Sequence, residues 1–388
     1  MEPQPVLPLV PYFINMDRRP LSLEVLTSLF SLQKGNMRSL RLYRVSRVCL
    51  IVPLFGFLVV VNNFFLFLDH LFFFRFRRQS IDSPVFIASP PRTGTTYLFH
   101  GMSDLERHFS TIKLWELLLA PSIIQKLIIL GMARVDRVFG GGGKKAWSFV
   151  ERIFFKPILN VHLTGMNHPE EDELMLLWSF ETAYFSLFYP DSDVARDLLR
   201  FDQEVSPRRK NRIMKRYKRL VQRHMYVFSK KSTKRFVSKN PFMISKLSSI
   251  KHHFPNALII TINRCPSSSV PSTVALNRAL TGMSSDILMP TKVESEVVDL
   301  MVDWYSYINH CLVKEKILPH LEVDFTDLIT HREDVINQAL VFLDLEKTLE
   351  NKTSVEIETT HTTPAKYHKL EGDERAKLFE RLPFLKPQ

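Results

Sequence analysis

The stretch of the sequence with the clearest chemistry is a short loop of small, hydroxyl-bearing and cationic residues. It reads Pro91-Arg-Thr-Gly-Thr-Thr96 and follows an apolar run that starts at Pro84. Successive backbone N–H groups, the positive end of a following helix, the threonine hydroxyls and the Arg92 guanidinium could converge on one anion. Gly94 would let the backbone approach that ligand closely. The pattern therefore predicts a strand, a phosphate-binding loop and a helix, in that order.

The loop differs from the Walker A pattern at two positions. Ser89 stands where the first glycine of G-x-x-x-x-G-K-[ST] would be, and Thr95 stands where the lysine would be. That lysine reaches the β- and γ-phosphates of a nucleoside triphosphate. The sequence therefore disfavours a nucleoside triphosphatase but retains a P-loop-like geometry. A proline-rich turn that happens to precede a helix is the simpler alternative.

Two further cations follow apolar runs of strand length. Lys239 follows residues 234–238, Arg264 follows residues 257–262, and residues 320–325 are a fourth candidate strand. Helical patterns alternate with these runs, which indicates an α/β domain with a parallel sheet. Ligands bind at the carboxyl ends of such strands, where Arg92 also lies. Three like charges at one edge would repel one another unless a polyanion binds there.

Size and composition favour one large folded domain. The chain has 388 residues, 45% of them hydrophobic, a net charge of +12 and three cysteines. We predict a three-layer α/β, P-loop-like domain with a central parallel sheet over residues 81–388, preceded by an N-terminal region, residues 1–80. The charge indicates acidic partners, but no zinc-finger, RNA-recognition or helix-turn-helix pattern accompanies it, so we expect no nucleic acid. The scattered cysteines argue against a metal site and redox chemistry.

The N-terminal region contains a hydrophobic helical segment at residues 48–74. The 21 residues from Val48 to Leu68 carry no charge, and a stretch of this length is long enough to cross a bilayer. Pro53, Gly56 and the pair Asn62-Asn63 weaken that interpretation. Three interpretations stay open: a true span, an interfacial segment with cationic ends at the headgroups, and a core helix of a soluble domain. We expect membrane association, on an unknown side.

Two of these motifs together resemble the cofactor motifs of sulfotransferases that use 3'-phosphoadenosine 5'-phosphosulfate. They are Pro91-Arg-Thr-Gly-Thr-Thr96 and Arg264-Cys-Pro-Ser-Ser-Ser-Val-Pro-Ser272, and the resemblance covers roughly residues 70 to 345. It is strongest to the large bacterial and Golgi-type branch, through the Arg-containing loop and the segments Pro169-Glu-Glu-Asp-Glu173 and Lys239-Asn-Pro241. Met243 departs from that branch, since relatives often have His there.

The resemblance implies a role for each matching residue. The residues implied for the 5'-phosphosulfate are Arg92, Thr93, Gly94, Thr95 and Thr96. Arg264 and Ser272 would bind the 3'-phosphate. Arg92 would also act on the leaving oxygen, with Lys239 as a second catalytic cation, and no metal is required. The general base implied is Glu116, a few turns after the loop.

Other carboxylates and histidines are weaker candidates for the base. Glu171 and Asp172 are held in reserve, although the segment from Asn167 to Trp178 also has the pattern of a helix start, with Pro169 at its first position and acidic residues in the first turn. His100 and His108 are interpreted as ordinary side chains, and Glu116 itself could be a plain surface carboxylate.

The expected activity is in-line transfer of a sulfuryl group from 3'-phosphoadenosine 5'-phosphosulfate to a hydroxyl or amine, with a carboxylate as base. The acceptor could be a lipid, a glycan or a small molecule. Two other functions stay open: a P-loop kinase-like phosphotransferase, which the residue at Thr95 argues against, and a non-catalytic, membrane-anchored nucleotide-binding protein.

Overall fold

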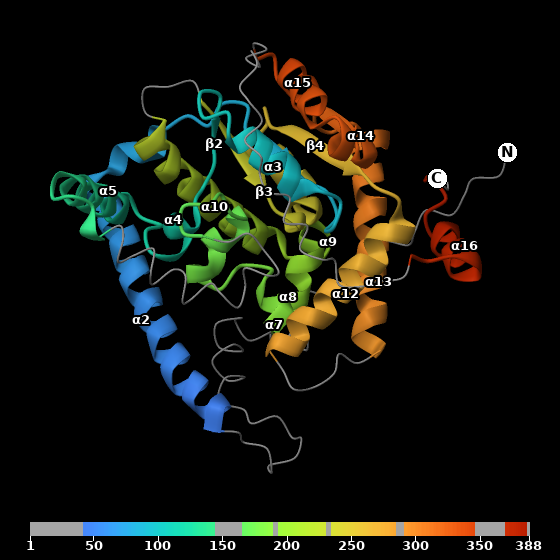
Figure 1. The fold of residues 1–388 in the computed structure, drawn as a ribbon, viewed down its shortest axis with the longest axis horizontal. Coiled ribbons are helices and arrows are strands. Elements are labelled where there is room, and N and C mark those ends of the chain that lie inside the picture. The colour runs from blue at the N-terminus through green and yellow to red at the C-terminus, as the bar shows by residue number, and fades with distance from the viewer. Residues whose placement is uncertain are drawn as a thin grey trace.

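The fold is built on a parallel β-sheet whose strands are covered by helices on both faces (Figure 1). The computed structural model describes residues 42–143, 165–188, 193–229, 234–284, 291–345 and 369–385. In these residues the sheet has five strands in the order β2-β3-β1-β4-β5, and every pairing is parallel. The strands are β1 (Val85–Ile87), β2 (Phe109–Ser110), β3 (Arg235–Lys239), β4 (Leu258–Asn263) and β5 (His320–Asp324). The predicted α/β class and parallel sheet are confirmed.

The strand order creates a switch point between β1 and β4. The chain leaves β1 toward β2 and β3 on one side of the sheet, whereas β4 leads to β5 on the other side. Crevices for ligands open at the carboxyl ends of the strands at such a point. Because the loop of Pro91–Thr96 follows β1 and Arg264 follows β4, the two predicted motifs meet at this crevice.

Alternating side chains of the strands face two separate hydrophobic cores. Val85 and Ile87 of β1 lie in one core, and Phe86 between them lies in the other. This alternation follows from the period of two in a strand. The first core is covered by α3 (Thr95–Ser103), α14 (Phe325–Thr330) and α15 (Arg332–Phe342); the second contains residues of α10 (Pro207–Phe228), α11 (Leu247–His253) and α13 (Thr291–Ile308). The domain therefore has three layers, as predicted.

Further helical elements connect these parts of the described chain. They are η2 (Phe74–Arg78), α4 (Leu114–Leu118), α5 (Ile123–Val138), η3 (Asp172–Ser179), α7 (Phe185–Phe188), α8 (Asp193–Asp197), η4 (Leu198–Arg200), α9 (Phe201–Glu204), η5 (Pro241–Lys246), α12 (Pro266–Ser284), η6 (Asn309–Lys314) and α16 (Gly372–Glu380). Helix α10 is strongly amphipathic, because its apolar residues recur at helical spacing opposite a basic face.

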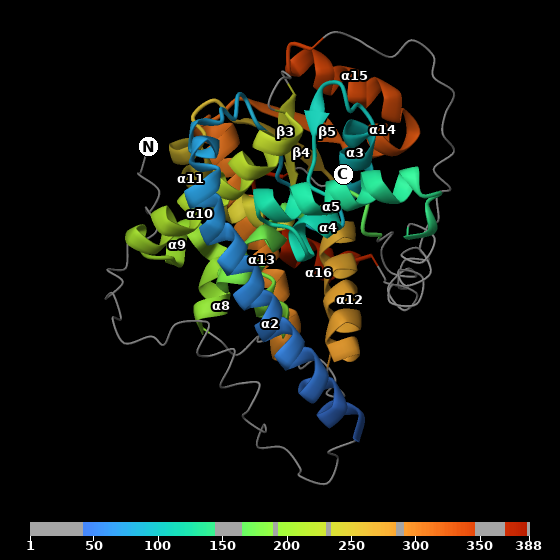
Figure 2. The ribbon, with the colours of Figure 1, turned by 90° about the vertical axis from the view of Figure 1, so that its left-hand side faces the viewer.

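The hydrophobic N-terminal segment forms one long helix, α2 (Leu42–Phe72). It lies along the body of the molecule, and its N-terminal end extends past that body (Figure 2). By length and composition, residues Pro53–Phe72 could cross a membrane. The predicted region 1–80 is described only from Leu42 onward, and residues 1–41 lie outside the described chain.

Candidate active site

The loop after β1 has the backbone shape of an anion-binding loop. Arg92 and Gly94 both have positive φ angles, 64° and 91°, and Gly94 is the N-cap of α3. Thr95 and Thr96 are the first residues of that helix, so their N–H groups lie among those without acceptors inside it. Such a terminus attracts anions. The buried Thr93 is different, because its hydroxyl donates to the Pro90 carbonyl at 2.8 Å and holds the loop itself.

Glycine is required at position 94 for two reasons. Its φ lies in the left-handed region, and a Cβ placed there would lie 3.3 Å from the side chains of Phe325 and Leu328. The loop is therefore packed closely against the start of α14. A larger residue would push the loop away from the sheet edge at which the cations gather.

The two predicted phosphate motifs are in direct contact. The Arg92 Nε donates to the Ser272 Oγ at 3.0 Å, and Arg264 donates through Nη1 to the Arg92 carbonyl oxygen. The Arg264 guanidinium also lies over the Phe325 ring, 4.3 Å from its centroid. Two guanidinium groups are thus brought to one place, where a polyanion would relieve their mutual repulsion.

Lys239 lies at the same sheet edge, at the end of β3. It is paired in register with Ile87 of β1, so its backbone is level with the start of the loop. Its Nζ lies 2.6 Å from the Glu171 Oε1, and the Tyr184 hydroxyl donates to the Glu171 Oε2. The Glu171 side chain is 16% exposed, whereas Lys239 is buried. This ion pair is partly accessible and lies at the sheet edge from which the loop after β1 starts.

The rest of the acidic segment is buried and fully engaged. Asp172 accepts hydrogen bonds from Tyr217, Ser238 and Asn240, and Glu173 pairs with Lys246 at 2.6 Å. Burial raises the pKa of both carboxyls, although these partners oppose the rise. Both residues therefore join η3 to the end of β3 and to η5.

The predicted helix start at Pro169 is wrong in position. The described helix begins at Asp172 and is of the 3-10 type. The reason is that residues 166–170 hydrogen-bond in an extended manner with residues 112–115, including a bridge between Lys113 and Pro169. The acidic residues consequently make specific ion pairs and hydrogen bonds beyond the capping that the sequence alone explains.

Glu116 lies in a different, closed cluster. It sits in the first turn of α4 and is 2% exposed, so it is not a surface carboxylate. Its Oε2 lies 2.8 Å from the His224 Nδ1 and 3.7 Å from the Lys126 Nζ, and its Oε1 accepts from the Lys113 N–H at 3.1 Å. The His224 Nε2 in turn contacts the Ser110 Oγ at 2.8 Å.

Electrostatics in this cluster keep Glu116 charged. Burial by itself raises the pKa of Glu116, but His224, Lys126 and the Lys113 N–H outweigh it and lower the pKa overall. Burial lowers the pKa of Lys126, against the attraction of Glu116 and Asp69. His224 lies among the buried, mostly apolar positions of α10. Nothing local in the sequence marks the partners of His224, Lys126 or Tyr184, so these residues could not be singled out from it.

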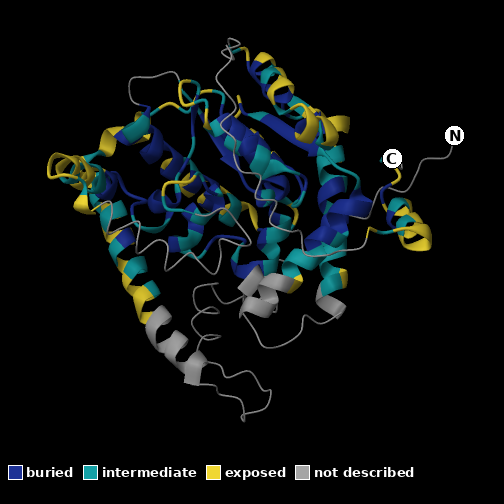
Figure 3. Cartoon of the chain, in the orientation of Figure 1, coloured by how far each residue is buried: buried dark blue, intermediate teal, exposed yellow. Residues whose placement is uncertain are grey.

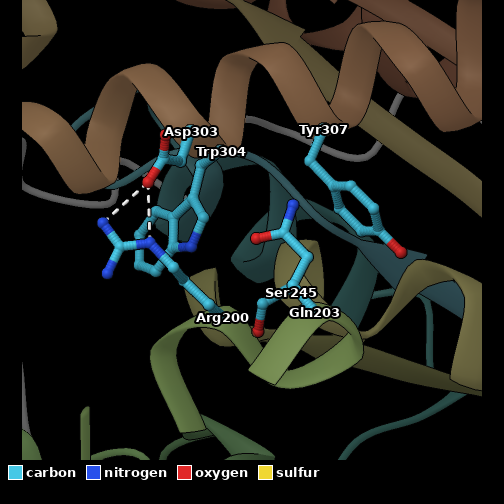
Figure 4. Close-up of a pocket in the computed structure, with 6 residues that line it drawn as sticks. All are labelled: Arg200, Gln203, Ser245, Asp303, Trp304 and Tyr307. Carbon is cyan, nitrogen blue, oxygen red and sulfur yellow. Dashed lines mark hydrogen bonds and ion pairs between the residues drawn. The ribbon is translucent and has the colours of Figure 1, made fainter. Parts of the chain in front are cut away.

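The remaining residues considered from the sequence stay ordinary or structural. His100 lies in the last turn of α3, and Met243, at the position where relatives often have His, is buried in the second core. A small pocket lies elsewhere, between η4, α9, η5 and α13 (Figure 4). It is lined by Arg200, Gln203, Ser245, Asp303, Trp304 and Tyr307. None of these residues belongs to the predicted site, and an ion pair of 2.6 Å joins Arg200 to Asp303 there.

Comparison with protein families decides the identity. The model of the sulfotransferase family matches residues 84–349, which include both phosphate motifs, Lys239 and both acidic clusters. The chain belongs to the sulfotransferase family. Comparison with curated proteins found no match.

Solved sulfotransferases share the fold at low sequence identity. Sulfotransferase STF1 from Mycobacterium tuberculosis H37Rv aligns with a TM-score of 0.58 and 16% identity, over 84% of this chain and 83% of that one. Sulfotransferase STF9 from Mycobacterium avium aligns with a TM-score of 0.53 and 16% identity, over 71% of this chain and 67% of that one. At this identity the likeness concerns the fold of the sulfotransferase, not its acceptor.

Proposed function

We propose that this sulfotransferase uses 3'-phosphoadenosine 5'-phosphosulfate as sulfuryl donor and transfers the group to a hydroxyl or amine of its acceptor. The observation that carries the proposal is the contact of Arg92 with Ser272 and of Arg264 with the Arg92 carbonyl, at the switch point of the sheet. Two phosphate motifs that are 172 positions apart in sequence meet there. A donor with phosphate groups at both ends of its ribose needs two such neighbouring sites.

The residues present fit this donor. The loop and the first turn of α3 would hold the 5'-phosphosulfate, through backbone N–H groups and Thr95 and Thr96. Arg264 and Ser272 would hold the 3'-phosphate with charge-assisted hydrogen bonds. The stacking of Arg264 on Phe325 supports this role, because it fixes the plane of the guanidinium. The bound donor would supply the activated sulfuryl group.

The transfer needs cations near the leaving phosphate oxygen and a base near the attacking atom of the acceptor. The acceptor oxygen or nitrogen forms a bond to sulfur while the bond from sulfur to the 5'-phosphate oxygen breaks, and the acceptor proton passes to a carboxylate. Arg92 and Lys239 would stabilise the negative charge that develops on the phosphate oxygen, in the way that cationic clamps act in phosphoryl transfer. The chain's own side chains suffice for these tasks.

Of the two candidate bases, the contacts favour Glu171 over Glu116. Both carboxylates have both oxygens engaged, but Glu171 is partly accessible, with Lys239 and Tyr184 as partners, whereas Glu116 is buried in its own cluster. A base must come within hydrogen-bonding reach of the proton that it accepts. If Lys239 turns toward the transferred group, Glu171 loses its cationic partner and becomes available to the acceptor. Glu116 would then act as a buried positioning residue.

The acceptor that best suits the architecture is a lipid or a membrane-bound glycan, with α2 associating the enzyme with a membrane as a span or as an interfacial segment. Glu171 lies directly before η3, and Trp178 at the other end of η3 stacks on Phe55 of α2, with ring centroids 5.6 Å apart. The candidate acceptor site and the apolar helix are thus about one short helix apart, roughly 14 Å.

The test of the proposed donor is calorimetric titration with adenosine 3',5'-bisphosphate, beside ADP and ATP. We expect selective binding of the bisphosphate. Replacing Arg264 by Ala should weaken it by about 1.5 to 3 kcal/mol, because one charge-assisted phosphate contact is lost. Arg212→Ala is the matched control, since Arg212 is an exposed arginine of α10 that pairs with Glu181.

Two results would contradict the proposal. Equal or tighter binding of ATP would favour a kinase-like phosphotransferase and remove the role of the 3'-phosphate site. Selective binding without any transfer of radiolabelled sulfuryl groups to lipid, glycan or water would instead favour a non-catalytic nucleotide-binding protein.

A further inference from the structure

The outer face of α2 carries large apolar side chains that no other part of the described chain covers. These residues recur about every three to four positions, so they form one stripe along the helix. They are Leu54, Phe57, Val60, Phe64, Phe67, Leu71 and Phe72, each more than half exposed. Soluble proteins rarely leave such a continuous patch in water, and larger ones mark a site of protein or membrane contact.

A second helix extends this apolar face. Helices α2 and α5 are in contact, and both carry exposed residues (Figure 3). The exposed apolar residues of α5 are Leu127, Ile128, Met132, Val135 and Val138. Together with the stripe on α2 they form what we call the α2–α5 face. The apolar run in the sequence indicated only the part of this face that α2 contributes.

The inner side of α2 is fixed to the catalytic domain by polar groups. The Asn63 Nδ2 donates to the Trp178 carbonyl at 2.9 Å, and Asn62 bonds with the Leu118 carbonyl and with Gln125. Asp69 accepts from the Ile123 N–H at 3.0 Å, and an ion pair of 2.8 Å links it to Arg223. The side chains of Asn62 and Asp69 are completely buried.

These contacts are incompatible with a helix that is surrounded by lipid. A span needs about 20 residues in the hydrocarbon, and residues Pro53–Phe72 are the part of α2 long and apolar enough. Phe55 stacks on Trp178 near the start of that part, and Asp69 binds Arg223 near its end. One side of the same 20 residues therefore contacts the water-soluble domain throughout, and only the other side is open to lipid.

Cationic side chains border the face at both helices. Arg75, Arg77 and Arg78 follow α2 and are exposed, and Arg134 and Arg137 are exposed on α5. Basic residues next to an apolar helix face attract anionic headgroups while the apolar side chains enter the boundary of the acyl chains. The apolar side chains of the α2–α5 face and the arginines beside it therefore suit contact with an anionic bilayer better than exposure to water.

We propose that the α2–α5 face seats the enzyme in one leaflet of an anionic membrane, with α2 lying in the plane of the interface and not crossing it. The proposal goes beyond the sulfotransfer activity and does not depend on the identity of the donor. It favours the interfacial over the spanning alternative, and it includes α5 in the membrane-binding surface.

The first experiment compares two valines of similar exposure with purified full-length protein and sedimenting vesicles of phosphatidylcholine, with and without phosphatidylserine. Val60 on α2 is 68% exposed and Val341 on α15 is 59% exposed. We expect Val60→Asp to lower the partition coefficient by roughly tenfold and Val341→Asp to leave it unchanged. Thermal unfolding of both variants should match the unmodified chain, since both positions face outward.

The second experiment distinguishes the plane from the span. A peptide tag at the N-terminus and the catalytic domain should be digested by protease from the same side of sealed membranes, because an in-plane helix leaves both on one side. Protection of only one of them would show a span and overturn the proposal. Equal vesicle binding of both valine variants would overturn it as well, as would a stable dimer without vesicle binding, which would show that a second copy covers the face.

Discussion

Glu116 and Glu171 each contact a lysine, yet the two carboxylates have opposite surroundings. Glu116 is 2% exposed and is held by His224, Lys126 and a backbone N–H. Glu171 is 16% exposed and is held by Tyr184 and by Lys239, which lies at the end of β3. A closed cluster satisfies its charge internally and stabilises the fold, whereas an open pair can exchange its partner for a ligand.

The comparison also shows how the two carboxylates are held in a fixed relation. The segment 112–115 includes the start of α4, which carries Glu116, and it hydrogen-bonds with the segment 166–170, which precedes Glu171. Glu116 is thus part of the support of the segment that presents Glu171. Removing either carboxylate should affect activity, but through different steps.

The largest effect is expected from Glu171→Gln. If Glu171 accepts the proton, its loss should lower kcat for sulfuryl transfer by roughly 10² to 10⁴, with little change in the binding of adenosine 3',5'-bisphosphate. Transfer of radiolabelled sulfuryl groups to a membrane lipid extract measures the rate. Glu315→Gln is the control, because Glu315 is exposed and distant in sequence. Full activity of Glu171→Gln, with an inactive but stably folded Glu116→Gln, would return the role to Glu116.

The next effect concerns stability at Glu116. Glu116→Ala leaves the buried Lys126 without its counter-ion and the buried His224 Nδ1 without its partner, so we expect the free energy of unfolding to fall by about 3 to 5 kcal/mol. Urea unfolding followed by circular dichroism measures it. The matched control is Glu315→Ala, since Glu315 also contacts a histidine, His310 at 3.2 Å, but both are more than half exposed. A surface pair contributes about 0 to 1 kcal/mol, so similar losses in the two variants would refute the buried network.

The fold and the meeting of the two predicted motifs were predictable because their signals are local. Each of the main strands is a short apolar run followed by turn residues; Arg264 directly follows β4, and Arg92 lies in the loop after β1. Parallel strands place such residues at one edge without further information. Strand β2 was missed because it has only two residues, Phe109 and Ser110, which is too short for any periodic pattern.

The surroundings of the carboxylates were not predictable for the same physical reason. Glu116 is 108 positions from His224, and Glu171 is 68 positions from Lys239, so tertiary packing alone brings each pair together. From the sequence, both Glu116 and Glu171 were candidates for the base, but the sequence does not indicate which of the two is buried. Helix α2 presents the same difficulty. A helix surrounded by lipid and a helix with only one side facing lipid can have the same apolar run in the sequence.

The smallest effect, the response to pH, separates the closed cluster from the buried acid next to Glu171. The pKa of Glu116 is lowered from the usual 4.5, so the stabilisation that Glu116→Gln removes should be constant from neutral pH to about 4.5 and disappear only as the pH falls through the lowered value.

The pKa of Asp172 is raised by burial from the usual 3.8, so its ionised form opposes folding at neutral pH. As the pH falls through that raised value toward 3.8, the unmodified chain should gain stability relative to Asp172→Asn, by at most about 1.4 kcal/mol per pH unit. Urea unfolding of the three chains from neutral pH to about pH 4 measures both slopes. Parallel slopes for the two variants would mean that the clusters do not differ in charge state, and the distinction between a structural and a reactive acid would then depend on exposure alone.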